Sequence, residues 1–527
     1  MYKSLKVKTV FVLCCLTTLL LAQYSANATN NTTSTAPHLS AAQTDKLHQY
    51  AKSTVQYFTS EDANNLSVGF THAFFGEGKF QECSNGSCSE VAWDLTRGYG
   101  SHVNINEVTL RFLSLAVAHK MDWLDGSEIE KYESSWGQIY LGLQTLRNMQ
   151  LSGDINQTNN DHFYRVYLTA DPTQGDSDRT IIIRDPGVYT VSSDDNGLPY
   201  MNLLILEGLA HDAELTSAQR NEIIELSQTI RSNIDLSSFV VDNKIVHNFD
   251  STNSEHWDRM SAEGPIILTA LMLSEQLDWH NFNQIEPSLE NNPVDWDGWN
   301  GTIPIEVPSF HSAMFIHGLR AIHGLPVTPD EGNVDFFESS TYPVFKAHLD
   351  YAEHFGYQAL GSQVMTQSLN GIPLFETETQ QIQFAGNEQN NKPGQGVSPA
   401  TAPHAWFIPL ARWSYLEQSE IDLLFSWMAA YEAEFFHENG LGWEAAVPWM
   451  PNDKTNAWQA SDGKWKYTDW GRPHEALNSA YIVLSVFDAL NPERPLASYN
   501  IESQKSAFFS AYYDRNINSQ FLPIVQK

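Results

Sequence analysis

Apolar residues recur three and four positions apart along most of this chain, whereas strict alternation of apolar and polar residues is scarce. The first pattern is typical of amphipathic helices and the second of half-buried strands. Two short segments, Thr180–Arg184 and Ile382–Ala385, are strand-like, and we expect them as loop hairpins. The pattern predicts about twelve helices, over residues 41–59, 104–122, 127–150, 198–213, 217–233, 258–277, 309–323, 342–356, 403–416, 420–437, 473–490 and 499–514.

Three of the expected helix starts carry the spacing of a capping box, in which two side chains satisfy the free backbone N–H groups of the first turn. They are Ser127-x-x-Glu130, Thr216-x-x-Gln219 and Ser419-x-x-Asp422.

The segment Tyr189–Ala210 sets two adjacent carboxylates at the head of a strongly apolar helix. Asp194 and Asp195, followed by an Asn-Gly pair, suit a turn and helix N-cap, and Pro199 suits the first helical turn. The two carboxylates either cap a buried helix or take part in chemistry at its start.

The first 28 residues have the pattern of an export signal. A lysine-rich start is followed by an apolar run and by the small-residue cleavage site Ala26-Asn27-Ala28. We expect a signal peptide over 1–28, a polar leader over 29–40 and one domain over 41–527. No later apolar run is long enough to span a bilayer, and no lipid-anchoring Cys follows the signal, so we expect a periplasmic or secreted protein without a membrane anchor.

Only two of the four cysteines, Cys83 and Cys88, remain after the signal is removed. They lie in CSNGSC, and in an oxidising compartment we expect them to form a disulfide across this short loop. We expect no metal site, because no further thiolates lie nearby. We also expect no cofactor, because the sequence carries no HExxH, Walker-type loop, GxSxG or complete dinucleotide-binding loop.

The chain is strongly acidic, with 63 Asp and Glu against 30 Lys and Arg and a net charge of −33. This charge repels nucleic-acid phosphates, anionic lipid and polyanionic glycans, so a neutral ligand is favoured. The alternative is that the charge only solubilises the surface.

Aromatic residues favour a carbohydrate ligand. Many of the 15 Trp residues lie in polar loops, where an indole presents a flat apolar face to a sugar ring; the alternative is that they pack loops onto the core. His404 and His474 begin expected helices and either contact sugar hydroxyls or cap the helices. The expected substrate-binding residues are Trp406, His404, Trp443, Trp449, Trp470, His474 and Arg259.

Three segments in order, NINEVTLRFLSLAVAHKMDWL, HFYRVYLT and VSSDDNGLPYMNLLILEGL, resemble the opening third of the glycoamylase-like (α/α)6 glycoside hydrolases, the group that includes the bacterial endo-β-1,2-glucanases. HWDRMSAEGPIILTALMLSEQL, ATAPHAWFIPLARW and ENGLGWEAAVPW extend the resemblance over most of residues 100–490. The resemblance implies an all-α (α/α)6 toroid of six inner and six outer helices. The long loops, around 153–190, 278–308, 357–402 and 439–470, would form its cleft.

Hydrolysis of a glycosidic bond requires two carboxyl groups, one protonated and one ionised. The candidates are Glu263, Asp195, Glu444, Asp194 and Glu475; Glu475 opens the last inner helix, and the resemblance places acidic residues at the other four. Each alone is also explained as a charge that favours a helix N-terminus. Apolar neighbours raise a carboxyl pKa, so we assign Glu263 as the acid and leave Asp195 or Glu444 as the base or a substrate ligand.

These observations predict an exported glycoside hydrolase that acts on a neutral glucan or glucooligosaccharide, for which the resemblance suggests a β-1,2 linkage. Two alternatives remain: a polysaccharide lyase on the same toroid and a non-catalytic glycan-binding scaffold. A lyase would use basic residues to neutralise a uronate, and the candidate helix starts offer only Arg259 and Arg472.

Overall fold

The structure is a computed structural model, in which the chain divides into a short N-terminal unit, Met1–His38, and a main unit, Leu39–Lys527. The elements below belong to the main unit. The predicted signal peptide and most of the leader lie outside the described residues. The structure describes residues 37–61, 63–76, 79–84, 87–92, 102–124, 134–151, 162–163, 167–169, 181–183, 190–246, 248–250, 264–277, 293–296, 305–308, 314, 318, 322–323, 337, 341–356, 358, 360, 400–401, 403–445, 447–448 and 473–503.

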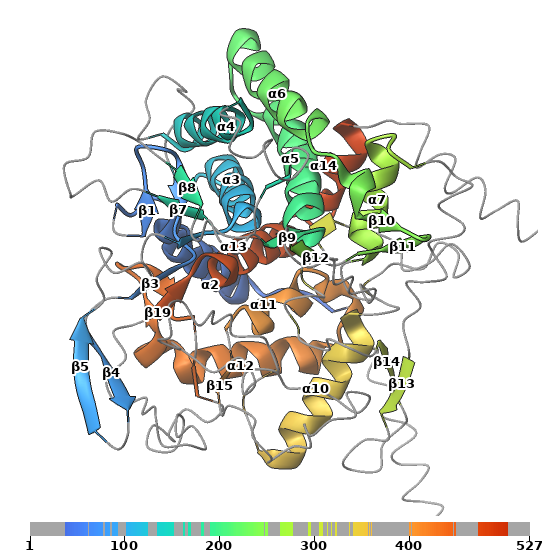
Figure 1. Ribbon diagram of the computed structural model, residues 1–527. Coiled ribbons are helices and arrows are strands. Elements are labelled where there is room, and N and C mark those ends of the chain that lie inside the picture. The colour runs from blue at the N-terminus through green and yellow to red at the C-terminus, as the bar shows by residue number, and fades with distance from the viewer. Residues whose placement is uncertain are drawn as a thin grey trace, which may run out of the picture. The chain divides into compact units, whose positions relative to one another are not determined.

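Helices dominate the described part of the chain, and each overlaps a helix expected from the sequence (Figure 1). Residues 314, 318 and 322–323, within the expected helix 309–323, are helical as well. The helices are α2 (Ala41–Thr54), α3 (Ile105–Lys120), α4 (Ser135–Leu151), α5 (Asp194–Asp212), α6 (Ser217–Ser232), α7 (Gly264–Leu273), α10 (Tyr342–Phe355), α11 (His404–Leu410), α12 (Gln418–Phe435), α13 (Ala476–Leu490) and α14 (Leu496–Ser503).

The strands are short and pair antiparallel. The expected hairpin piece Thr180–Arg184 contains β8, and Ile382–Ala385 lies outside the described residues. The pairs are β1 (Asn64–Asn65) with β2 (Phe70–Thr71), β3 (Phe74–Gly76) with β19 (Pro473–Glu475), β4 (Lys79–Ser84) with β5 (Ser87–Ala92), β9 (Thr190–Ser192) with β12 (Asn248–Asp250), β10 (Val240–Val241) with β11 (Lys244–Ile245), β13 (Pro293–Trp296) with β14 (Ile305–Pro308), β15 (Ala400–Thr401) with β18 (Val447–Pro448) and β16 (Phe436–His437) with β17 (Gly442–Trp443), and β7 (Tyr167–Thr169) joins β6 (His102–Val103) to β8 (Ile181–Ile183).

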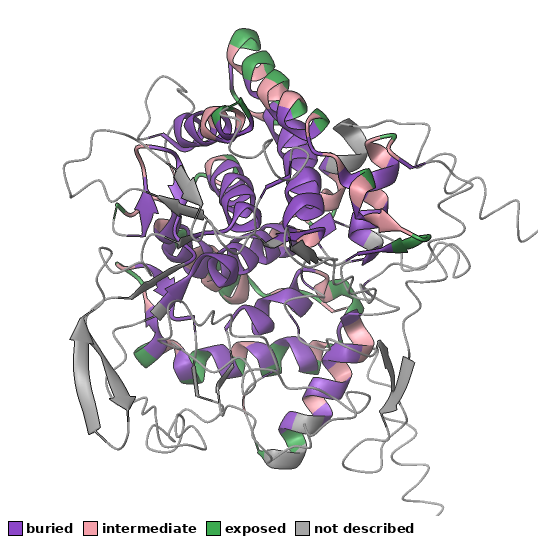
Figure 2. Cartoon of the chain, viewed as in Figure 1, coloured by how far each residue is buried: buried purple, intermediate pink, exposed green. Residues whose placement is uncertain are grey.

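Burial separates the helices into two groups (Figure 2). Helices α3, α5 and α13 are buried along nearly their whole length, whereas α6 and α12 expose one side. Helix α3 contacts α5 and α13, α5 also contacts α7, and α13 also contacts α11, while α4 and α6 lie outside α3 and α5. A helix that is apolar around most of its circumference needs partners on several sides, which explains the inner group.

The described positions between 314 and 323 also pack against the inner helices. The ring of His323 lies 3.0 Å from the side-chain oxygen of Asn202 in α5. Gly318 faces Ile408 of α11 and Tyr481 of α13. This stretch therefore belongs with α3, α5, α7, α11 and α13.

Several inner helices begin directly after a short paired strand. Strand β6 precedes α3, β9 precedes α5, β15 precedes α11 and β19 precedes α13, and each strand pairs with a different partner. The ladder hydrogen bonds fix the chain just before the helix starts, so the first side chains of each inner helix have defined positions.

The sequence places the start of α5 wrongly. The helix begins at Asp194 with Ser193 as N-cap, so Asp194 and Asp195 lie in its first turn and Pro199 lies inside it. The cause is β9, which ends at Ser192 and brings the chain straight into the helix. Because Pro199 has no N–H group, it makes no helical hydrogen bond to the carbonyl four residues earlier, that of Asp195.

The predicted capping boxes have mixed outcomes. Thr216 and Gln219 form one at the start of α6, as predicted. The prediction at Ser419 is wrong, because α12 begins earlier and Glu417 and Glu420 form its box. The third pair, Ser127-x-x-Glu130, lies outside the described residues.

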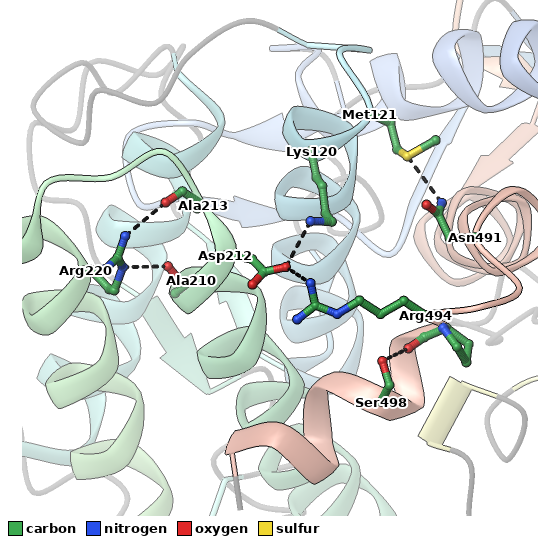
Figure 3. Close-up of polar contacts among 10 residues, drawn as sticks. Lys120, Met121, Ala210, Asp212, Ala213, Arg220, Asn491, Arg494 and Ser498 are labelled. Carbon is green, nitrogen blue, oxygen red and sulfur yellow. Dashed lines mark hydrogen bonds and ion pairs between the residues drawn. The ribbon is translucent and has the colours of Figure 1, made fainter.

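Ion pairs tie the C-terminal ends of α3 and α5 to the turn before α14 (Figure 3). Asp212 at the end of α5 pairs with Arg494 and, at 3.1 Å, with Lys120 at the end of α3. Burial acts to raise the pKa of Asp212, but hydrogen bonds from Arg494 and Lys120 outweigh it and lower the pKa. Arg220 also donates to the Ala210 carbonyl at 3.1 Å, near the end of α5.

No helix in the described ranges has both the length and the apolar content that crossing a bilayer requires.

Candidate active site

The starts of the inner helices converge. The N-cap of α3, Asn104, donates to Asp195 in the first turn of α5. A Cβ at Gly197 of α5 would lie 2.4 Å from Ile267 in the first turn of α7, so these two helix starts touch. Residues that begin separate inner helices are thereby brought together.

Asp195 is 4% exposed and is held by two donors. The amide of Asn104 donates to Oδ1 at 2.8 Å, and the hydroxyl of Ser192 donates to Oδ2. Hydrogen bonds to a carboxylate and a position in the first turn of a helix both favour the ionised form. The geometry therefore favours an anion at Asp195.

Glu107 lies in the first turn of α3, is 3% exposed and is not among the candidates from the sequence. Burial, and after it the negative charge of Asp195, raises its pKa from 4.5 to about 8. Its Oε2 atom is buried and has no hydrogen-bond partner among the residues that the structure describes. Burial and the charge of Asp195 therefore favour the protonated form of Glu107.

The sequence gives a signal at Glu107, but it is ambiguous. Asn104-x-x-Glu107 has the spacing of a capping box, which explains both residues without chemistry. In the structure the Asn104 side chain instead accepts from the Asn106 N–H at 2.8 Å and donates to Asp195. Only the contact with Asp195 in α5, 88 positions after Glu107, distinguishes a catalytic pair from a simple capping box.

Asn196 fixes the loop beside Asp195. Its side chain accepts from the Phe163 N–H at 2.8 Å and donates to the Phe163 carbonyl at 3.1 Å and to the Ser192 carbonyl at 2.8 Å. Asp194, next to Asp195, is less deeply buried. Of the two adjacent carboxylates, Asp195 is the one placed beside Glu107.

Tyr57 connects this carboxyl pair to the start of α13. Its hydroxyl donates to the His72 carbonyl at 2.7 Å. Burial raises its pKa most, and the charges of Glu107 and then Glu475 raise it further. Glu475, the 1% exposed N-cap of α13, therefore lies near the same tyrosine as Glu107.

Glu444 and His474 are linked to this polar region through His437 and Tyr57. Glu444 Oε1 lies 2.9 Å from His437 Nε2, and the His437 and His474 rings are 6.1 Å apart. The ring of His474 also lies 6.5 Å from that of Tyr57. The structure thus connects Asp195, Glu475, Glu444 and His474 through neighbouring groups.

The two described tryptophans of the predicted binding set are in the core. Trp406 and Trp443 are 5.6 Å apart in edge contact, and Trp406 also contacts Tyr431. Their described ring contacts are with aromatic side chains, and their role in sugar binding stays a prediction.

His404 is fully buried at the start of α11. Burial lowers its pKa to about 3, with a weaker opposing effect from its hydrogen bond with Asn478. His404 is therefore a neutral imidazole, and contact with a sugar hydroxyl stays a prediction.

Glu263, Arg259, Trp449 and Trp470 lie outside the described residues. Glu263 directly precedes Gly264, the first residue of α7, and the start of α7 touches the start of α5. In the described ranges, no group of three or more His, Cys, Asp or Glu side chains is arranged to hold a metal ion.

The pair of Glu107 and Asp195 has the properties that acid–base catalysis requires. Burial beside a charge favours the protonated form of Glu107, and accepted hydrogen bonds favour the ionised form of Asp195. Such a pair can protonate a leaving oxygen and either activate water or stabilise positive charge.

No protein-family model and no curated protein matches the chain. Solved structures do match over nearly its whole length. An endo-β-1,2-glucanase from Talaromyces funiculosus in complex with sophorose has a TM-score of 0.59 at 9% identity, covering 92% of this chain and 90% of that chain. An endo-β-1,2-glucanase from Chitinophaga pinensis has a TM-score of 0.54 at 10% identity, covering 88% and 98%.

A protein from Bacteroides caccae described as a candidate glucoamylase gives a TM-score of 0.55 at 12% identity, covering 87% of this chain and 98% of that chain. At such identities the likeness concerns the fold. The described helices, with an inner group that begins at one site, agree with it. The chain therefore has the (α/α)6 toroid fold of these glycoside hydrolase structures.

Proposed function

We propose that this protein is a periplasmic or secreted glycoside hydrolase that cleaves a neutral glucan by carboxyl acid–base catalysis. The observation that carries the proposal is the pairing of Glu107, protonated at neutral pH, with the hydrogen-bonded carboxylate of Asp195 at the inner-helix starts. The fold supports it, because the matching structures include endo-β-1,2-glucanases.

In this proposal Glu107 gives its proton to the leaving oxygen. Asp195 is the ionised carboxylate that either activates water or stabilises the positive charge on the sugar ring. Glu263 remains the alternative proton donor, since it immediately precedes the start of α7. The acidic chain favours a neutral substrate, and β-1,2-glucan is the first substrate to test because two of the three matching structures named above are endo-β-1,2-glucanases.

The decisive experiment incubates the purified protein with a panel of neutral glucans that includes β-1,2-, β-1,3-, β-1,4- and α-1,4-linked chains, and measures new reducing ends. We expect release from at least one of them. Unsaturated, ultraviolet-absorbing products from a uronate polymer would instead indicate a lyase. Binding without any new reducing ends would indicate a glycan-binding scaffold.

Variants then assign the roles. We expect Asp195→Asn and Glu107→Gln each to lose at least ~10²-fold in hydrolysis, the usual scale for a positioned acid or base. A substrate with an activated leaving group hardly needs protonation, so it should recover part of the loss in Glu107→Gln and none in Asp195→Asn.

Glu225→Gln makes the same chemical change on the exposed side of α6 and should keep wild-type turnover. If Glu107→Gln turns over like the wild type while Glu263→Gln is inactive and is rescued by the activated substrate, Glu263 is the acid.

A further inference from the structure

Glu444 is held more firmly than a side chain in a surface hairpin would be. Its own N–H donates to the Phe435 carbonyl at 3.0 Å. The next residue, Ala445, accepts a hydrogen bond at 2.9 Å from the side chain of Asn478 in the first turn of α13. The backbone is therefore fixed at Glu444 and directly after it, from two different elements.

The residue before Glu444 is fixed as well. The Trp443 carbonyl lies 3.1 Å from Nδ1 of His474, and because a carbonyl only accepts, this nitrogen carries the hydrogen. Three consecutive residues, 443–445, thus each make a hydrogen bond to a residue outside the segment. Such redundancy is a form of preorganisation, since the backbone position of Glu444 does not depend on any one bond.

Gly442 determines where this segment runs. Its φ of +78° lies in the left-handed region, and a Cβ there would lie 2.4 Å from the Cα of Thr54 in α2. Both facts require glycine. The hairpin between β16 and β17 is consequently pressed against α2, with Glu444 directly after it.

The side chain of Glu444 has its own partner. Nε2 of His437 lies 2.9 Å from Oε1, and the two residues are seven positions apart across the hairpin. Glu444 is 6% exposed, so its carboxylate has little water to solvate it. An N–H donor from His437 compensates for part of the lost solvation and selects one orientation of the carboxylate.

We propose that His437 is a positioning residue, which holds Glu444 as a third functional carboxylate of the reaction. This inference rests on the proposed hydrolase function. Glycosidic cleavage develops positive charge on the sugar ring, and an oriented carboxylate in a site of low water content stabilises that charge. Because the charge exists only in the transition state, the contribution of Glu444 falls on kcat rather than on KM.

Four variants test this on the glucan that the wild type hydrolyses: His437→Ala, His437→Gln, Glu444→Gln and the double variant H437A/E444Q. We expect His437→Ala to lower kcat by ~10- to 100-fold with KM nearly unchanged, the scale of a misplaced catalytic group. His437→Gln retains an N–H donor and should restore most of the turnover. The double variant should be no slower than Glu444→Gln alone, because His437 acts through Glu444.

His48→Ala is the matched control, since it also removes a histidine that is hydrogen-bonded to another side chain, here the indole of Trp123 at 3.1 Å. It should leave kcat unchanged. If His437→Ala is obtained only unfolded, the comparison uses His437→Gln against His437→Met, which has a similar size and no N–H donor.

A folded donor-free variant with wild-type kcat overturns the proposal, and so does a double variant in which the two losses multiply. A wild-type protein that hydrolyses no neutral glucan overturns the proposed function, and this inference with it. An active wild type in which only Glu107 and Asp195 matter overturns this inference alone.

Discussion

Replacing Glu107 by Gln should stabilise the folded protein at neutral pH while it abolishes most of the hydrolysis. Gln has the shape of a protonated Glu but does not titrate. In the folded protein the pKa of Glu107 is raised from 4.5 to about 8, through burial first and the charge of Asp195 second. At pH 7 the unfolded chain therefore carries an ionised Glu107 and the folded chain a neutral one.

Folding at pH 7 then requires uptake of a proton at this site. Each pH unit between the unfolded pKa and the working pH costs about 1.4 kcal/mol, so the free energy of unfolding is lowered by about 3 kcal/mol at pH 7. Because the folded pKa is raised, the full stability is present below pH 4.5 and is lost as the pH rises toward 8. Glu107→Gln has no such loss.

Thermal unfolding of both proteins between pH 4 and pH 8, together with hydrolysis rates, measures the effect. We expect the variant to have the higher Tm at pH 7 to 8, equal Tm near pH 4, and turnover reduced by at least ~10²-fold. Glu225→Gln on α6 controls for loss of a carboxylate in general. A difference in Tm that does not change with pH, or a variant that is less stable at pH 8, would refute the reasoning about burial.

Three further predictions concern other parts of the fold. Gly442→Ala should lower the free energy of unfolding by about 1 to 3 kcal/mol in chemical denaturation and reduce kcat, because it strains the backbone and displaces β17. An unchanged kcat would mean that the β16–β17 hairpin has no part in the reaction. Glu207→Gln leaves the buried Arg231, whose Nε lies 2.8 Å from Glu207 in the wild type, without its counter-charge, and it should lower the free energy of unfolding by about 3 to 5 kcal/mol. A loss below about 1 kcal/mol would mean that water reaches the pair. We expect a Cys83–Cys88 disulfide, because the two residues lie opposite each other in the β4–β5 ladder, a spacing that suits one. Two free thiols, detected by the intact mass of the exported protein, would contradict this prediction.

Sequence periodicity predicts the helices well, because a 3.6-residue apolar pattern depends only on local spacing. It fails at the start of α5, where the helix begins four residues early because β9 pairs with β12, a strand that lies far along the chain. The box at Glu417 was missed for a related reason: Glu is an unusual N-cap, and nearby Ser419 offered the familiar one.

The site was predicted in part. Asp195 and Glu444 were recognisable as acidic residues at helix or strand ends, and the structure gives both fixed partners. Glu107 was missed because its pKa depends on burial and on Asp195, neither of which is written in the residues around it. Trp443 shows the reverse: its neighbours Gly442 and Glu444 are small or polar, yet its indole lies in the aromatic core.

The starts of four inner helices are held independently of one another, because a separate strand ladder precedes each of α3, α5, α11 and α13. Each ladder holds one helix start against a different partner strand, so a change in one connecting segment re-aims one group of side chains and leaves the others where they are. The helix ends at the opposite side, tied by Asp212, Lys120 and Arg494, are untouched by such a change. A change in one ladder therefore moves the carboxyl group at that helix start, such as Asp195 after β9 or Glu475 in β19, while the groups at the other helix starts keep their positions.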